Sequence, residues 1–238
     1  MFRSYMYTGL FILFLCTLQA QENESESISG SEFERQLNVG EFINIKVYSG
    51  IELKLIPSEE NKLVISGEDR MDVVAKIKGQ TLKIRHSLEH IFNPTFTYVE
   101  VYHSEELDYI SLYQGAKLKA DSVYKQTSIS LKIQEGSEAE FKFEGEKLTS
   151  IVNTGGKLFL SGKATTHHSS VTSGGSCEGE TFETEQSKVN VTAGGMSYIH
   201  ATELVEAKVT AGGTIRIYGN PKKMITKKSI GGQIFEMK

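Results

Sequence analysis

The sequence has few cysteines, no excess of basic residues and no long hydrophobic run, and each absence removes a class of protein. Its 238 residues include two cysteines, and the formal net charge is −4, with 26 basic against 30 acidic residues. Such a chain lacks the basic surface that neutralises a phosphate backbone, so we expect no nucleic-acid partner. A hydrophobic share of 39% still allows a sizeable core at this length.

The apolar run at the N-terminus is too short to span a bilayer. It reads GLFILFLCTL from Gly9 to Leu18, follows Arg3 and precedes a polar stretch, which is the layout of a secretory signal peptide at residues 1–20. Lipidation of Cys16 is a rival interpretation, and the large residues before Cys16 disfavour it. It is the only membrane attachment that the sequence suggests. Cleavage after Ala20 leaves one cysteine and therefore no internal disulfide.

Residues 21–36 are predicted to be a disordered acidic tether. Glutamates alternate there with serines and other polar residues, a composition that does not build a core. They are Glu22, Glu24, Glu26, Glu32 and Glu34. The rest of the chain is predicted to hold an N-terminal β-strand region at 37–109 and regular repeats at 110–238, continuous as one domain.

A glycine recurs at a nearly constant spacing through the second half of the chain. The clearest units are VTSGG and VTAGG, and the series comprises Gly115, Gly136, Gly155, Gly174, Gly194, Gly212 and Gly231, at spacings of 21, 19, 19, 20, 18 and 19 residues. A constant short period is typical of a stacked solenoid. The runs between the glycines alternate apolar and polar residues, which indicates strands and not the helices of longer repeats.

Apolar residues also fall in register around these glycines. Val152, Val171 and Val191 lie three residues before theirs, and Leu118, Leu158 and Cys177 lie three residues after. Stacked apolar columns are what a β-helix needs, because each coil lies about 4.8 Å from the next. The sequence therefore predicts an all-β fold, a parallel β-helix with coils of about 19 residues and an irregular N-terminal β cap.

The repeated glycines are interpreted as structural turn residues, since glycine accepts positive φ and leaves room for the neighbouring turn. The set is Gly115, Gly136, Gly155, Gly156, Gly174, Gly175, Gly194, Gly195, Gly212, Gly213, Gly231 and Gly232. The first coils carry Gln114-Gly115 and Glu135-Gly136 where later coils carry Ser, Thr or Ala before Gly-Gly, and we expect irregular geometry there. Calcium-binding nonapeptide repeats are excluded because their aspartates are missing and the period differs.

The chain resembles the putative auto-transporter adhesin head GIN domain proteins over roughly residues 36–238. The resemblance rests on GEFINIKVYSGIELKLIPSEENKLVISG, on TYVEVYHSEELDYISLYQGAKL, and most specifically on IYGNPKKMITKKSIGGQI. It implies a right-handed β-helix and an extracytoplasmic location. It carries over no catalytic residue.

Two groups of residues are candidates for a binding surface. Phe96, Tyr98 and Tyr102 belong to an aromatic cluster that either forms an exposed patch or plugs the wider end of the core. Glu144, Glu183 and Glu203 lie eight or nine residues after their marker glycines and are predicted to form a row on one outer face. That row serves either as a solubilising surface or as part of a site.

The remaining reactive residues are given structural interpretations. Cys177 is predicted to be a buried small hydrophobe, and His167 and His168 are predicted to be surface residues. His86 and His90 have a metal-ligand spacing only on a helix, and we expect a loop there. The sequence predicts no catalytic residue, no metal site and no cofactor.

These observations together predict an exported, non-catalytic β-solenoid in the periplasm or at the outer cell surface. A ladder of repeated side chains suits an extended ligand, so the expected partner is an unidentified glycan or protein. Two alternatives stay open, a carbohydrate-active enzyme on a β-helix and a purely structural component of the envelope.

Overall fold

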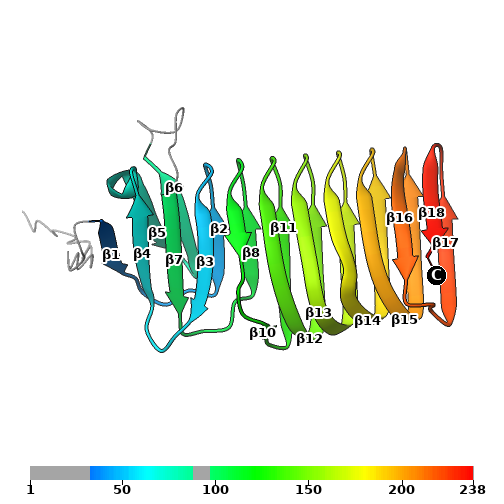
Figure 1. Ribbon diagram of the computed structural model, residues 1–238, viewed down its shortest axis with the longest axis horizontal. Coiled ribbons are helices and arrows are strands. Elements are labelled where there is room, and N and C mark those ends of the chain that lie inside the picture. The colour runs from blue at the N-terminus through cyan, green and yellow to red at the C-terminus, as the bar shows by residue number, and fades with distance from the viewer. Residues whose placement is uncertain (1–32, 88–96, 238) are drawn as a thin grey trace, which may run out of the picture.

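Alternating apolar and polar residues make nearly every element of this protein a strand. The computed structural model describes residues 33–87 and 97–237 and shows an elongated stack of strands (Figure 1). The elements are β1 (Glu34–Asn38), β2 (Asn44–Val47), β3 (Glu52–Pro57), β4 (Lys62–Gly67), the short 3-10 helix η1 (Arg70–Asp72), β5 (Val73–Lys78), β6 (Thr81–His86), β7 (Thr97–His103), β8 (Tyr109–Leu112), β9 (Lys117–Lys119), β10 (Tyr124–Lys125), β11 (Ser128–Ile133), β12 (Glu138–Val152), β13 (Lys157–Val171), β14 (Ser176–Thr192), β15 (Met196–Thr210), β16 (Gly213–Tyr218), β17 (Lys223–Lys228) and β18 (Gly232–Glu236).

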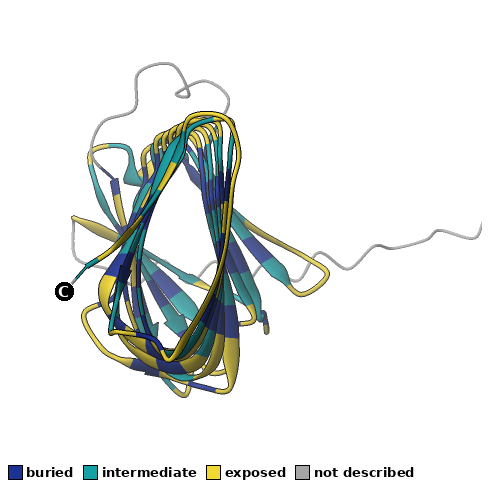
Figure 2. Cartoon of the chain, turned by 90° about the vertical axis from the view of Figure 1, so that its right-hand side faces the viewer, coloured by how far each residue is buried: buried dark blue, intermediate teal, exposed yellow. Residues whose placement is uncertain are grey.

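Each regular coil consists of one long strand and one tight turn. The strands β12 to β15 bend near their middle, so each contributes to two facing sheets, and the end view shows the resulting flattened tube (Figure 2). We call the strands that follow the tight turn the post-turn sheet and those that precede it the pre-turn sheet. Neighbouring coils pair in parallel and in register, as Ala139 with Leu158 and Leu158 with Cys177. The predicted β-solenoid is therefore confirmed.

The regular stacking begins earlier in the chain than the marker glycines indicated. Ser49 and Gly50 form the same tight turn, and the coil β2–β3 stacks in parallel on β8–β9, with Val47 beside Leu112 and Leu53 beside Leu118. In the chain, the segment β4 to β7 is inserted between these two coils. In space, it stacks on the side of β2–β3 that faces away from β8–β9, at the N-terminal end of the solenoid. It and β1 contribute the antiparallel pairs at the N-terminal end.

The tight turns explain why one motif is repeated. In the turns from Ser49-Gly50 to Ala211-Gly212 both central residues have positive φ, for example 57° at Glu135 and 73° at Gly136, which is the type I′ combination. In most turns the amide of the marker glycine then donates to a carbonyl of the next turn, as from Gly115 to Glu135 (3.0 Å) and from Gly155 to Ser173 (3.1 Å). Turns with Gln or Glu in the first position have this geometry too, so the irregular turns expected there are absent. The irregularity of these first coils lies in their shorter strands, β8 to β11.

The second glycine of each Gly-Gly pair is required for a different reason. A Cβ at Gly175 would lie 2.8 Å from the carbonyl oxygen of Val152 in the previous coil, and one at Gly156 would lie 2.5 Å from that of Ile133. Ala116 and Ser137 occupy this position in the first two coils of the series. Close approach between coils therefore demands glycine only further along the stack.

The predicted inward columns are buried, with polar side chains among them. Cys177 is fully buried as expected, and burial raises the pKa of its thiol to about 11. His167 is not the predicted surface residue: it points inward between Leu148 and Ser187, 1% exposed, and its Nε2 lies 2.9 Å from the hydroxyl of Ser150. The phase of alternation after the bend in β13 puts His167 inside and leaves His168 partly exposed.

Three other expectations concern residues at or beyond the described ranges. His86 is the last residue of β6 and is buried, not in a loop, because the alternation of β6 turns it inward. Residues 34–36, which were assigned to the tether, belong to β1. The signal peptide, Cys16, His90 and Phe96 lie outside the described residues. Within residues 33–87 and 97–237, no helix is long and apolar enough to cross a membrane.

Candidate binding face

The outer face of the post-turn sheet presents one column of side chains that crosses nine strands. The column consists of the residues four positions after the tight-turn glycines, together with Glu100 of β7, which is the register partner of Lys54. In spatial order these are Glu100, Lys54, Lys119, Glu140, Phe159, Glu178, Tyr198, Arg216 and Phe235. Because neighbouring strands lie about 4.8 Å apart, the column spans roughly 38 Å. We call it the outer column.

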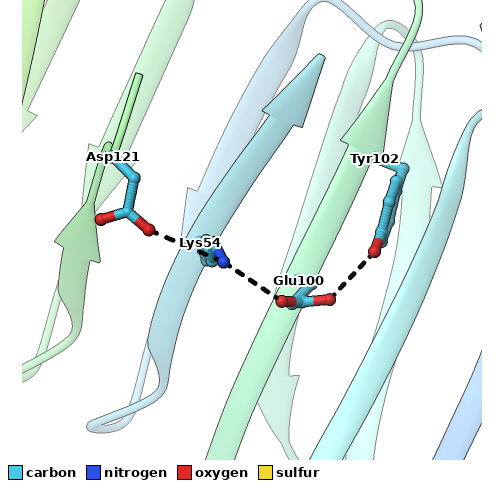
Figure 3. A network of polar contacts seen from close by, with 4 residues as sticks. All are labelled: Lys54, Glu100, Tyr102 and Asp121. Atoms are coloured by element: carbon cyan, nitrogen blue, oxygen red, sulfur yellow. Dashed lines mark hydrogen bonds and ion pairs between the residues drawn. The ribbon is translucent and has the colours of Figure 1, made fainter. Parts of the chain in front are cut away.

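The N-terminal part of the outer column is charged and joined by ion pairs. The ammonium of Lys54 lies 3.5 Å from Glu100 and 3.6 Å from Asp121, and the hydroxyl of Tyr102 donates to Glu100 at 3.0 Å (Figure 3). Partial burial and the bond to Glu100 raise the pKa of Tyr102. These side chains come from β3, β7 and the segment after β9, so the network ties two strands of the sheet to the segment that follows a third.

A shallow groove of about 300 Å³ lies beside this network. Its wall includes Tyr98, which is 45% exposed, together with Glu52, Lys54, Glu100 and Lys119. One exposed ring among carboxylates and ammonium groups offers both an apolar contact and hydrogen bonds of either sense. This combination suits hydroxylated or peptide ligands.

The C-terminal part of the outer column alternates aromatic and charged residues. Phe159, Tyr198 and Phe235 lie on every second strand, about 9.6 Å apart, with Glu178 and Arg216 between them. The guanidinium of Arg216 lies 5.1 Å from the centre of the Tyr198 ring and donates to its hydroxyl at 3.0 Å. The column therefore changes in character halfway along the solenoid.

A second groove, of about 410 Å³, lies at the corner where the long strands bend. It is lined by Glu144, Lys163, Glu183, Glu185 and several threonines. Lys163 and Lys125 lie 3.0 and 3.4 Å from the carboxylate of Glu144. The hydrogen bond from Lys163 and the charge of Lys125 lower the pKa of Glu144. A carboxyl held ionised in this way is a poor general acid.

The structure changes the interpretation of the predicted glutamate row. Glu144 and Glu183 do share a column, but Lys163 lies between them, so the charges alternate. Glu203 lies outside this column, because the register between β14 and β15 shifts and pairs Glu183 with His200. Its carboxylate instead binds the ammonium of Lys222 at 2.8 Å.

The described members of the aromatic cluster, Tyr98 and Tyr102, do not plug the core. Tyr98 is exposed and Tyr102 is partly exposed, both on the outer face of β7, whose inward residues are Thr97, Val99, Val101 and His103. The interior of the repeat array instead contains other rings, of which Phe141 lies in an inward column five residues after its marker glycine. These are Tyr124, Phe141, Phe143 and Phe182.

The outer column itself was missed by the sequence analysis. The mostly apolar positions three and five residues after each marker glycine point inward, and the outer column takes the position between them. The signal was present, since Phe159, Tyr198 and Phe235 all lie four residues after theirs. Over residues 33–87 and 97–237, no three His, Cys, Asp or Glu side chains gather in a way that would hold a metal ion.

Comparisons with solved structures support the fold. The chain is similar to a putative adhesin from Bacteroides fragilis, with a TM-score of 0.77 and 18% identity over 88% of this chain and 99% of that one. A putative lipid binding protein from Parabacteroides distasonis (TM-score 0.69, 14% identity, 86% and 96% covered) and a putative adhesin from Parabacteroides merdae (0.66, 17%, 86% and 95%) have the same fold. No curated protein matches the chain.

The sequence also matches a described protein family. The match covers residues 41–221, from the strand before the first tight turn to the segment that leads into β17. This range includes the inserted strands, the tight turns from Gly50 to Gly212 and all of the outer column except Phe235. The chain therefore belongs to the family described as putative auto-transporter adhesin, head GIN domain.

Proposed function

We propose that this protein is an exported, non-catalytic binding module that recognises an extended ligand, a glycan or a protein, on the outer face of its post-turn sheet. The observation that carries the proposal is the outer column, a line of in-register side chains about 38 Å long on parallel strands. Stacked strands hold such a line rigidly, so a long ligand loses entropy on binding while the protein loses little.

The composition of the face supports binding in preference to catalysis. Rings at Tyr98, Phe159 and Tyr198 offer apolar contacts, and the charged residues between them offer hydrogen bonds. Glu144, which lies beside both Lys125 and Lys163 in the corner groove, has a lowered pKa and not the raised pKa of a catalytic acid. Membership of an adhesin-like family favours an exported location, the periplasm or the outer surface.

The binding experiment compares two faces of the same protein. The purified chain is screened against immobilised glycans and envelope proteins, and each hit is repeated with the variant F159A/Y198A/F235A. We expect that variant to lose at least about tenfold in affinity. The control T149A/H168A/N190A alters the pre-turn face and should bind normally. Equal losses in both variants, or unchanged binding in both, would refute the role of the outer column.

Location is tested separately, by protease treatment of intact and lysed cells that express the protein with a C-terminal tag. Cleavage on intact cells is expected for surface display. Protection until lysis places the protein in the periplasm and directs the ligand screen to envelope components. Protection of a tag that cell fractionation finds in the cytoplasm contradicts export altogether.

A further inference from the structure

The two ends of the solenoid are built differently. At the N-terminal end, antiparallel strands and the side chains of Leu37, Val39 and Ala75 pack over the core. At the C-terminal end, the last strands, β17 and β18, pair with β15 and β16 on one side only, within the part of the chain that the structure describes. The C-terminal end therefore presents an open edge whose backbone groups are available to a further strand.

The open edge at β17 is basic and fully exposed. All six residues of β17 are exposed, including Met224 and Ile225, and among the described residues Lys223, Lys227 and Lys228 form no ion pair. Lysines on an edge strand repel a like-charged edge and so oppose pairing of two such ends. The same charges attract a strand that carries carboxylates.

The chain itself contains a segment with the complementary pattern. Glu22, Glu24 and Glu26 alternate with neutral polar residues, so in a strand all three carboxylates lie on one side. Glu22 and Glu26 are four residues apart, as are Lys223 and Lys227, which share the outer side of β17. A directly paired strand would place the two sets of opposite charges about 5 Å apart at Cβ.

The segment cannot reach the open edge of its own molecule. Glu22 precedes Glu34, the first residue of β1, by 12 residues, which span at most about 41 Å when extended. From β1 to β18 the post-turn sheet has ten steps between neighbouring strands, or roughly 48 Å. Figure 1 shows β1 and β17 at opposite ends of the stack.

We propose that the acidic segment at residues 22–26 of one copy adds as a strand beside β17 of a second copy and links the protein head to tail. The added strand satisfies the open backbone edge, covers Met224 and Ile225, and pairs its carboxylates with the free lysines. The contact is heterologous, because it joins two different surfaces. An assembly of any length therefore still has one unused acidic segment at one end and one unused basic edge at the other, and it grows as a chain. This inference does not depend on the outer column.

The test uses charge reversal on either partner and sedimentation velocity over a range of protein concentrations. The chain from residue 21 onward should self-associate at low salt and dissociate as salt rises. K223E/K227E/K228E and E22K/E24K/E26K should each weaken association by at least about tenfold. An equal mixture of the two variants should associate again, because both interfaces are then complementary.

The control K117E/K142E/K157E makes the same change in charge on β9, β12 and β13, several coils away from the edge, and should associate like the wild type. Circular dichroism and thermal unfolding establish that every variant is folded. A wild type that stays monomeric at all concentrations overturns the proposal. So does a mixture that fails to associate, or a control that dissociates as much as the edge variant.

Discussion

The N-terminal coils and the regular coils differ in what fills them. Both regions bury some polar side chains, but large residues such as Leu53 and Leu82 fill the interior at the N-terminal end. The inward positions of β13 to β15 include the small residues Ser169, Cys177 and Ser197. The regular coils compensate with continuous parallel ladders and with hydrogen bonds between successive turns. The difference indicates that packing stabilises the capped end, while regular backbone pairing stabilises the repeat array.

The largest expected effect is the loss of a large side chain in the N-terminal coils. Leu53 is fully buried between Val99 and Leu118, so Leu53→Ala should lower the free energy of unfolding by about 2–5 kcal/mol. The matched change Leu158→Ala in the array should cost less, about 2–3 kcal/mol, because small inward neighbours such as Cys177 leave it fewer contacts to lose. Urea unfolding measures both, and equal costs would contradict the comparison.

A smaller loss of folding stability is expected at the positions where the tight turns of neighbouring coils approach one another. Gly175→Ala places a Cβ against the carbonyl oxygen of Val152 and should cost about 1–3 kcal/mol. Ser137 occupies the same turn position two coils earlier, and among the described residues its hydroxyl has no hydrogen-bond partner. Ser137→Ala should therefore leave the unfolding midpoint nearly unchanged. Equal destabilisation of both variants by thermal melting would show that close approach is not confined to later coils.

Acid should destabilise the array through His167. Burial lowers the pKa of this imidazole to about 3, against about 6.5 in the unfolded chain, so between these values the unfolded state binds more protons. The stability that comes from keeping His167 neutral is fully present above about pH 6.5. As the pH falls below that value, the free energy of unfolding decreases by about 1.4 kcal/mol per pH unit. His167→Gln should flatten the pH dependence of urea unfolding over this range. An unchanged slope would mean that His167 does not titrate in this way.

The smallest effect is expected on the surface of the array. Glu144→Gln removes the ion pairs with Lys125 and Lys163, which are exposed and screened by salt. Calorimetry at low and high salt should show no measurable change in the unfolding temperature. A clear loss at low salt would show that the corner ladder of charges stabilises the coils alongside the turns.

Much of the fold was predictable from the sequence because the repeat is local. One coil determines its own turn and its own alternation, so Val152, Val171 and Val191 are buried as the periodic pattern predicts. The candidate site was less predictable. Tyr98 and Tyr102 do lie on an outer face. Glu203 does not lie in the column that its spacing from the marker glycine predicts, because a bulge shifts the register between β14 and β15.

The sequence alone determined the solenoid, its period and its turn residues, since each depends on residues that are close together in the chain. Only the tertiary structure decided which distant residues meet. The insertion β4 to β7 lets Leu53 stack on Leu118 and brings Lys54 to Asp121. The bend in β13 turned His167 inward, and bulges set the register of the outer columns. Each of these depends on how coils pair, which no single coil encodes.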